Sequence, residues 1–176
     1  MSLLESLLGI GGAARGAAAA VGETASVRRI AAALARLPAE RARYLAAFAY
    51  VLARVAHADL RVVEEESRLM QEAVREHGGL DESEAALVTE LAIDQGHLLG
   101  GTENYLVTRE LRGIATRAER LAVLEAAFAI AAADGSIAES ESQEALAIGE
   151  ELGFAREEAL AVRSRFRDRL ASLARR

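Results

Sequence analysis

Cysteine and lysine are both missing from this chain of 176 residues, and each gap removes a class of chemistry. Without cysteine there is no disulfide framework, no thiolate metal site and no cysteine nucleophile, so a bound metal would need oxygen or imidazole ligands. Without lysine there is no Schiff-base chemistry and no lysine to bind phosphate. Zinc fingers and cysteine proteases are therefore excluded.

Aromatic residues are also scarce, at 4% of the chain, and there is a single proline. Hydrophobic residues nevertheless reach 52%, largely alanine and leucine, with glutamate and arginine between them. This usage is typical of packed helices rather than of sheets. A chain of this length can bury one proper core but not two. We therefore expect one all-α domain, a compact bundle of about seven to eight helices.

Long apolar runs and basic stripes are missing as well. The longest apolar run follows Arg41 and Arg43 and is interrupted at its end by Arg54 and His57, so it falls short of the roughly 18 to 20 residues of a membrane-spanning helix. A formal net charge of -6, with interspersed arginine and glutamate, argues against nucleic-acid binding. Glu5 precedes the first arginine, the reverse of a signal peptide. We expect a cytoplasmic protein, peripheral at a membrane or within a larger assembly.

Residues 1–24 differ in composition from the rest of the chain. Leucines and one isoleucine between positions 3 and 10 form a short apolar patch, and glycines and alanines follow it. Glycine at this density weakens a helix, so the segment reads as a Gly/Ala-rich apolar tail. One interpretation is a disordered end, and the other is a docking segment for a partner protein or a membrane surface. Residues 25–176 are then the helical domain.

Helix signals divide that domain. A capping-box pattern, in which an acid or threonine precedes a glutamate by three positions, opens helices at Asp81 and Thr116. Pro38 suits the first residue of a helix, while Gly79 and Gly153 follow helix ends. Apolar residues between positions 44 and 55 recur with the spacing of a buried helix. The expected helices cover residues 27–37, 38–55, 64–77, 81–96, 105–111, 116–131, 140–152 and 156–176.

An internal repeat links two parts of the chain. Residues 55–67 align without a gap with residues 130–142, and both contain the pattern Ala-Asp-x-x-[Val/Ile]-x-Glu-x-Glu-Ser. In each copy the pattern follows a buried helix and precedes an exposed one. The repeat predicts two pseudo-symmetric helix-loop-helix halves.

The second copy also carries a family resemblance. Residues 132–141, Ala-Ala-Asp-Gly-Ser-Ile-x-x-x-Glu, resemble the recurring Ala-Asp-Gly-x-[Ile/Leu]-x-x-x-Glu motif of the tellurite-resistance TerB family, and residues 105–111 and 120–125 are similar to compact TerB-like proteins. The resemblance covers about 44–167. It implies a helical fold with two acidic turns and a role in divalent-metal binding or in stress-response complexes near the membrane. It implies no known reaction. The first turn departs from the motif, since Leu60 replaces its glycine.

Six carboxylates in the two turns are candidate metal ligands. They are Asp59, Glu64 and Glu66 in the first turn, and Asp134, Glu139 and Glu141 in the second. Calcium or magnesium prefers several oxygens converging from a turn, although neither turn has the full EF-hand pattern. The alternative is structural, because glutamates in the first turn of a helix interact with its dipole and cap free N–H groups. Both interpretations stay open.

No catalytic motif is recognisable in the sequence. Phosphate-binding loops, nucleophile elbows and His-Glu-x-x-His zinc motifs do not occur. We therefore predict that the chain is not an enzyme but a TerB-like interaction module, in a stress-response or membrane-associated assembly, which docks a partner through its tail and helical surface. The alternative is a divalent-metal-binding stress protein that uses the acidic turns. A homo-oligomer is a further candidate assembly.

Overall fold

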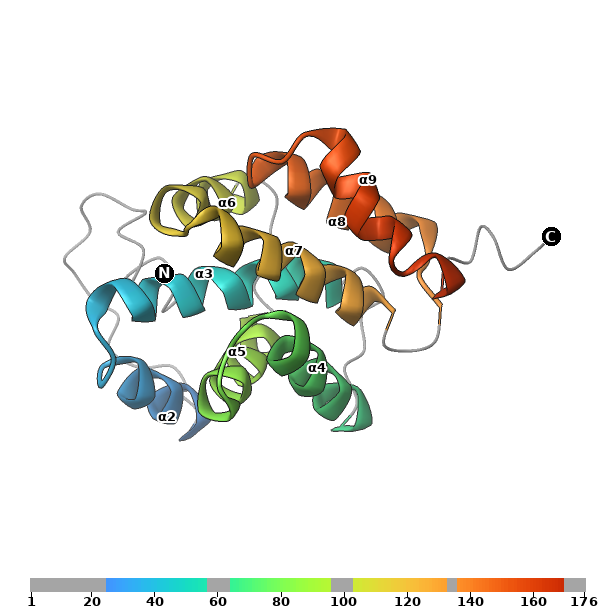
Figure 1. The fold of residues 1–176 in the computed structure, drawn as a ribbon. Coiled ribbons are helices and arrows are strands. Elements are labelled where there is room, and N and C mark those ends of the chain that lie inside the picture. Colours follow the sequence, from blue (N-terminus) through green and yellow to red (C-terminus); the bar gives the residue numbers. More distant parts are fainter. Residues whose placement is uncertain (1–24, 57–63, 96–102, 133–135, 170–176) are drawn as a thin grey trace.

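The computed structural model describes residues 25–56, 64–95, 103–132 and 136–169. Within these ranges the chain forms eight α-helices and one short 3-10 helix, η1, and no β-strand (Figure 1). This confirms the predicted all-α bundle. In chain order the elements are α2 (Ala25–Leu34), α3 (Ala39–Ala56), α4 (Glu64–His77), α5 (Glu82–Gln95), α6 (Glu103–Ile114), α7 (Arg117–Ala131), α8 (Glu139–Glu151), α9 (Arg156–Ser164) and η1 (Arg167–Arg169).

Two of the helix starts carry the predicted capping boxes. Before α7, the Glu119 N–H donates to Thr116 Oγ1 at 3.2 Å, and the Thr116 N–H donates to Glu119 Oε2 at 2.8 Å. Before α5, the Glu84 N–H donates to Asp81 Oδ1 at 2.8 Å. These bonds satisfy backbone donors that have no partner inside the helix. The sequence pattern therefore located both starts correctly.

The junction between α2 and α3 differs from the sequence prediction. Helix α2 ends at Leu34 rather than at 37, and the Leu37 N–H donates to the Leu34 carbonyl at 3.1 Å, which is a tighter turn than an α-helix makes. A residue before proline is disfavoured in the α conformation, so the early end follows from Pro38. The Pro38 carbonyl accepts the Ala42 N–H at 2.9 Å. Pro38 is thus the N-cap of α3 and not its first helical residue.

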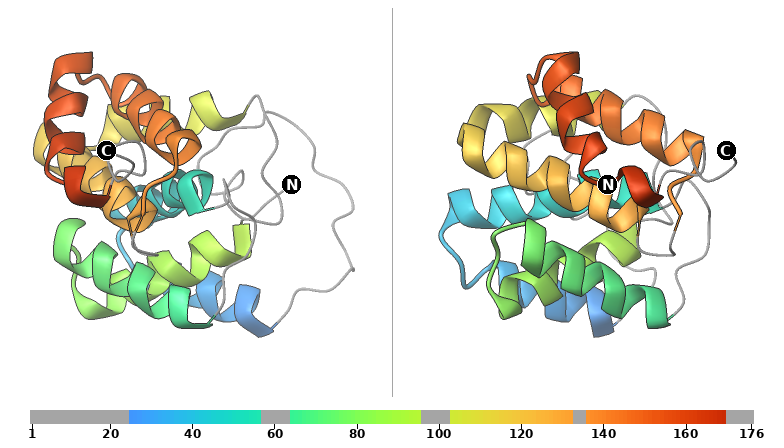
Figure 2. Two further views of the ribbon diagram at one scale, coloured as in Figure 1. Left: turned by 90° about the vertical axis from the view of Figure 1, so that its right-hand side faces the viewer. Right: turned by 45° about the vertical axis from the view of Figure 1, so that its right-hand side comes forward.

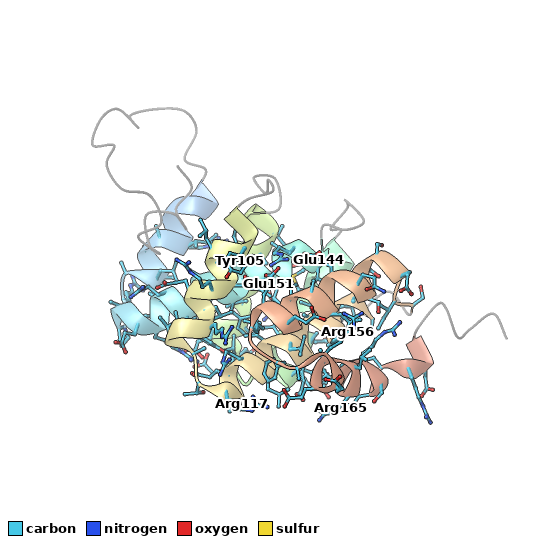
Figure 3. All side chains as sticks on the ribbon, turned by 90° about the horizontal axis from the view of Figure 1, so that it is seen from above. Tyr105, Arg117, Glu144, Glu151, Arg156 and Arg165 are labelled. Atoms are coloured by element: carbon cyan, nitrogen blue, oxygen red, sulfur yellow. The ribbon has the colours of Figure 1, made fainter. Side chains whose placement is uncertain are left out.

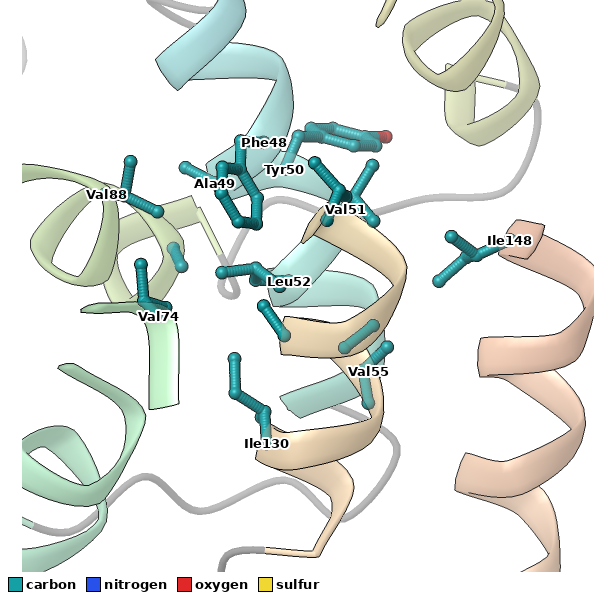
Figure 4. Close-up of a cluster of buried hydrophobic side chains, with 14 of the residues drawn as sticks. Phe48, Ala49, Tyr50, Val51, Leu52, Val55, Val74, Val88, Ile130 and Ile148 are labelled. Atoms are coloured by element: carbon teal, nitrogen blue, oxygen red, sulfur yellow. The ribbon is translucent and has the colours of Figure 1, made fainter. Parts of the chain in front are cut away.

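Helix α3 is the central element of the core. Every residue from 44 to 55 is buried, as the apolar pattern predicts. The helix contacts α5, α6, α7 and α8, which surround it (Figure 1). Figure 4 shows Phe48 and Leu52 on the side of Val74 and Val88, from α4 and α5, while Ile148 of α8 approaches from the other side. Burial on all sides explains why this stretch of α3 has no solvent-exposed polar face.

The packing of the helices repeats in the two halves. In the first half, α3 and α4 both contact α5, and α4 crosses to contact α7. In the second half, α7 and α8 both contact α9, and α8 crosses to contact α3. The central pair, α3 and α7, also contact each other. These matched contacts agree with the two pseudo-symmetric halves predicted from the internal repeat, while the contact of α7 with α8 has no comparable counterpart between α3 and α4 among the described residues.

The C-terminal helix is shorter than the sequence predicts. Helix α9 ends at Ser164, and η1 follows it within the described residues instead of a continued α-helix. Between them, the ring of Phe166 lies with its centroid 6.0 Å from that of Phe128 and 5.8 Å from that of His77. The chain therefore turns toward the core at this point, and a tertiary contact overrides helix propensity.

None of the described helices is both long enough and apolar enough to cross a membrane.

Candidate functional site

The second acidic turn leads into α8. Ile137 is buried, and Ala138 takes the N-cap position. Glu141 is only 8% exposed, and its Oε2 accepts the Ala138 N–H at 2.8 Å. This bond is half of a capping box, and it occurs although alanine cannot supply the other half. Glu141 therefore has the structural role that the sequence left as one of two interpretations.

The remaining metal candidates are not assembled in the described structure. Glu139 is exposed, accepts a hydrogen bond from Gln143 Nε2 at 2.7 Å, and lies 3.8 Å from Arg163. Asp59 and Asp134 lie outside the described residues. Glu64 and Glu66 lie on α4, with side chains outside the described set. In the part of the chain that the structure describes, no three histidine or acidic side chains gather as a metal site would require.

One polar atom beside this turn lacks a partner. Ser142 is 1% exposed, and its Oγ makes no hydrogen bond to any described residue. A buried hydroxyl without a partner costs free energy, so it calls for an explanation such as a water molecule or an ion. Ser142 follows the capping Glu141 directly in the sequence. A cation bound in the second turn would therefore have to lie next to Ser142 Oγ and the Glu141 carboxylate.

A buried ionic cluster joins α3, α6 and α8. The Arg54 side chain is 5% exposed; its Nη2 lies 2.7 Å from Glu144 Oε1 and its Nη1 lies 2.7 Å from Glu151 Oε2. Thr108 Oγ1 donates to the same Glu151 oxygen at 2.6 Å. Figure 3 shows Glu144 and Glu151 close to the exposed Tyr105. The cluster was not predicted, although a lone arginine in an apolar helix is the signal that could have found it.

The charges of this cluster stabilise one another. Burial opposes ionisation of Glu151, but hydrogen bonds from Arg54 and Thr108 outweigh it and hold the pKa of Glu151 below its usual range. Burial likewise opposes the charge on Arg54, and its bonds to Glu151 and Glu144 raise the pKa of Arg54 overall. Both partners therefore stay ionised near neutral pH, and neither exchanges a proton there.

Three further groups with shifted pKa values follow the same trend. A hydrogen bond from the Thr116 backbone lowers the pKa of Glu119, and one from the Ala155 backbone lowers that of Glu158. Burial raises the pKa of Tyr44. Each of these shifts moves the pKa of the group further from pH 7. A general acid or base needs a pKa close to the operating pH, so these groups are suited to structural roles.

A groove lies between α4 and α7, and residues that follow α9 form part of its lining. Its volume is about 400 Å³. Figure 2 shows the red C-terminal end of the described chain beside α7 and facing α4. The apolar part of the lining comes from leucine, alanine and phenylalanine, and the polar part from acids, a histidine and an arginine. The lining residues are Leu69, Glu72, Ala73, Glu76, His77, Ala129, Ala132, Arg165, Phe166 and Asp168.

The charges along this groove are unbalanced. Glu72 and Glu76 are exposed, lie one turn apart on α4, and form no ion pair with a described residue. Like charges at this spacing destabilise a helix by a few tenths of a kcal/mol. Arg165, the arginine of the groove, is already engaged by Glu125. The α4 wall of the groove therefore presents negative charge beside an apolar floor.

Comparison with known proteins gives one match. The family described as tellurite resistance protein TerB matches residues 44–164, which is more than half of the chain. The match includes the helices from α4 to α9 and most of α3. No curated protein matches the chain, and no solved structure matches it.

Proposed function

The chain belongs to the TerB family, and from this premise we propose that it is a non-enzymatic interaction module that docks a partner protein in the groove between α4 and α7. The observation that carries the proposal is the unpaired acidic wall of that groove. Glu72 and Glu76 repel each other in the free protein, and a bound cation would relieve this repulsion. A negatively charged wall would therefore attract a positively charged partner.

The chemistry of the groove defines the partner. The floor contains Ala73, Ala129 and Phe166, which offer apolar contact without hydrogen-bonding groups. The wall contains the two glutamates. A helix that carries apolar side chains on one face and arginine or lysine beside them would match both features. We therefore propose a basic amphipathic segment of a partner protein as the occupant.

The pKa shifts support a binding role over a catalytic one. Glu119, Glu151 and Glu158 have lowered pKa values, and hydrogen bonds from neighbouring groups account for each shift. Acid-base catalysis would instead require a carboxyl group with a raised pKa in a cavity. The groove contains two unpaired carboxylates, but both are exposed to solvent. Solvent-exposed charges of this kind act mainly through electrostatic attraction.

We further propose a second contact through residues 1–24, which lie outside the described structure. Their apolar patch would add a hydrophobic contact to the electrostatic one at the groove. Two linked contacts raise overall affinity by keeping the second site close once the first is bound. Such a protein would work in a cytoplasmic stress-response assembly or at a membrane surface, as the sequence predicts.

The groove is tested by removing its charge without changing its shape. We expect the Glu72→Gln/Glu76→Gln protein to bind a partner recovered by cross-linking about tenfold more weakly than the wild type does. Affinity is measured with the purified partner by calorimetry. The control is Glu82→Gln/Glu157→Gln, which makes the same change in net charge at two exposed positions outside the groove lining. Equal affinities for all three proteins would show that the groove is not the docking site.

Divalent-metal binding is the second candidate function. The observation that favours it is the buried Ser142 Oγ, which has no hydrogen-bond partner among the described residues and follows the buried Glu141 at the start of α8. A cation bound there would accept an electron pair from Ser142 Oγ, which has no hydrogen-bond partner among the described residues. Asp134, which lies outside the described residues, would have to supply a further oxygen. Binding would use both turns if Asp59, Glu64 and Glu66 took part as well.

Calorimetric titration of the metal-stripped chain with calcium, magnesium, zinc and manganese tests this function. If the turns bind a cation, we expect saturable binding that is lost in Asp134→Asn/Glu141→Gln. The matched control is Glu158→Gln, because Glu158 caps Ala155 at 2.9 Å as Glu141 caps Ala138. This control removes an equivalent cap and should leave metal binding unchanged. Absence of binding to the folded wild type would assign Glu141 to capping alone.

A further inference from the structure

The turn between α8 and α9 contains a glycine, Gly153, whose backbone is not covered by a side chain of its own. Gly153 has a φ of +87°, a conformation that favours glycine, and its N–H donates to the Glu150 carbonyl at 3.0 Å. A Cβ atom at Gly153 would stand 2.8 Å from Arg112 Nε and 3.1 Å from Arg120 Nη1. Two guanidinium groups therefore lie side by side against the backbone of this turn.

These two arginines come from different helices, and neither forms an ion pair with a carboxylate of the described residues. Arg112 lies in the last turn of α6, is exposed, and makes no hydrogen bond or ion pair with another described residue. Arg120 lies on α7, and its Nη1 donates to the carbonyl of Leu152. Its Nε is buried and has no hydrogen-bond partner in the described structure. Two adjacent positive charges thus remain unneutralised, with one N–H group left unsatisfied.

The acids around the turn are engaged elsewhere. Glu150 pairs with Arg156, Glu151 pairs with Arg54, and Glu158 pairs with Arg117. Glu157 makes no ion pair with either Arg112 or Arg120 among the described contacts. The positive charge of the pair is therefore not cancelled locally, although the protein as a whole carries a formal charge of -6.

A third guanidinium and an aromatic ring complete the surroundings. Arg117 lies with its guanidinium carbon 5.1 Å from the centroid of the Phe154 ring, and that of Arg120 lies 5.9 Å from it. Contact with one ring holds both side chains close to the turn. None of these three arginines belongs to the lining of the groove between α4 and α7.

We propose that Arg112 and Arg120 form a binding site for a phosphate group at the turn between α8 and α9. Guanidinium groups match the geometry of phosphate oxygens and donate paired, charge-assisted hydrogen bonds to them. A doubly charged anion would neutralise both guanidiniums and accept hydrogen bonds from the exposed guanidinium of Arg112. The glycine leaves room for the two guanidinium groups to lie against the turn, because a Cβ atom at position 153 would lie 2.8 Å from Arg112 Nε.

A structural role alone would make a different prediction. The C-terminal end of α8 carries a partial negative charge, and nearby cations stabilise it. The bond from Arg120 to the Leu152 carbonyl is a contact of this kind. Helix capping explains the position of the Arg120 side chain, but it gives no role to Arg112. Binding that depends on Arg112 would therefore separate a phosphate site from helix capping.

The test is a nuclear magnetic resonance titration of the full chain, labelled with ¹⁵N. Inorganic phosphate is added at constant ionic strength, with sodium chloride as the reference anion, and the side-chain Nε–H signals of Arg112 and Arg120 are followed with the Gly153 amide. We expect saturable shifts at these three groups with phosphate. We expect at least about a tenfold loss of affinity in Arg112→Gln and a smaller loss in Arg112→Lys, which keeps the charge but not the planar fork.

The control is Arg75→Gln, which removes one exposed arginine from α4. It should bind phosphate as the wild type does. Vesicles of phosphatidylcholine with and without phosphatidic acid identify the source of the phosphate group. Arg112-dependent binding to the phosphatidic-acid vesicles would point to a lipid headgroup, and binding to inorganic phosphate without vesicle binding would point to a free phosphate. Shifts that do not saturate, or that are the same in Arg112→Gln, would overturn the site and leave both arginines as helix caps.

Discussion

Replacing Phe48 with alanine is expected to lower the free energy of unfolding by about 4 kcal/mol, the largest loss we expect from one substitution in this core. Phe48 is 0% exposed and lies on the central helix α3. Its Cζ lies 2.9 Å from the position that a Cβ on Gly78 would take, so the ring rests directly on the end of α4. The substitution removes this contact and opens a cavity between α3, α4 and α5.

Urea denaturation followed by circular dichroism measures the loss. We expect the midpoint to fall while the slope with urea concentration stays the same, since the surface exposed on unfolding changes little. Tyr105→Ala is the control, because Tyr105 is 57% exposed; its effect should stay within about 0.5 kcal/mol. A loss below about 1.5 kcal/mol for Phe48→Ala would mean that the core closes around the cavity and that α3 is not held as tightly as its burial indicates.

The fold could largely be predicted because its signals are local or periodic. The apolar spacing between 44 and 55 needs only the geometry of one helix, and α3 is buried over that whole stretch. The capping box at Thr116 needs only four consecutive residues, and its hydrogen bonds are present. The repeat of residues 55–67 at 130–142 carried information about tertiary structure as well. A duplicated sequence pattern implies duplicated packing, which the contacts of α4 with α7 and of α8 with α3 confirm.

The contacts that define the candidate sites could not be predicted in the same way. Glu144 and Glu151 are seven positions apart, so one helix face must carry both. Nothing in that spacing says that they meet Arg54, which lies on another helix and 90 positions away from Glu144. The approach of Arg112 to Gly153 depends in the same way on how α6 sits against α8. Such contacts depend on the relative placement of helices, which local patterns do not specify.

The acidic turns show where one pattern has two physical explanations. The spacing that would bring Glu141 to a cation also brings it to the Ala138 N–H, and the described structure contains the second contact. Capping and ligation use the same carboxylate oxygens, so sequence spacing cannot separate them. The buried Ser142 Oγ is the feature that keeps metal binding as a testable proposal, because capping does not explain it.

Replacing Arg54 with methionine is expected to lower the free energy of unfolding by about 3 kcal/mol at pH 7, the second large effect. Methionine fills much of the volume of arginine, so the loss of unfolding free energy comes from the missing charge and not from a cavity. Arg54 is 5% exposed, and its removal leaves Glu144 and Glu151 close together without their cation. Both glutamates keep partial access to water, which holds the expected loss at the lower end of the range for buried pairs.

The effect of Arg54→Met should depend on pH in one direction. The pKa of Glu151 is lowered in the folded protein, so its interaction with Arg54 stabilises the fold above the ordinary carboxyl pKa of 4.5 and is lost as the pH falls through the lowered value. The wild type should therefore lose stability below pH 4.5, and the difference between wild type and variant should shrink there. Urea denaturation at neutral and acidic pH measures both.

A triple variant separates the cost of an unpaired carboxylate from that of a lost helix contact. Arg54→Met/Glu144→Gln/Glu151→Gln removes all three charges, and we expect it to recover a large part of the loss at pH 7, since isolated buried charges cost more than neutral groups. Thr108 can still donate its hydrogen bond to a glutamine at 151, because the amide oxygen accepts as the carboxylate does. If the triple variant is no more stable than Arg54→Met, the arginine stabilises the junction of α3, α6 and α8 through packing and not through its charge.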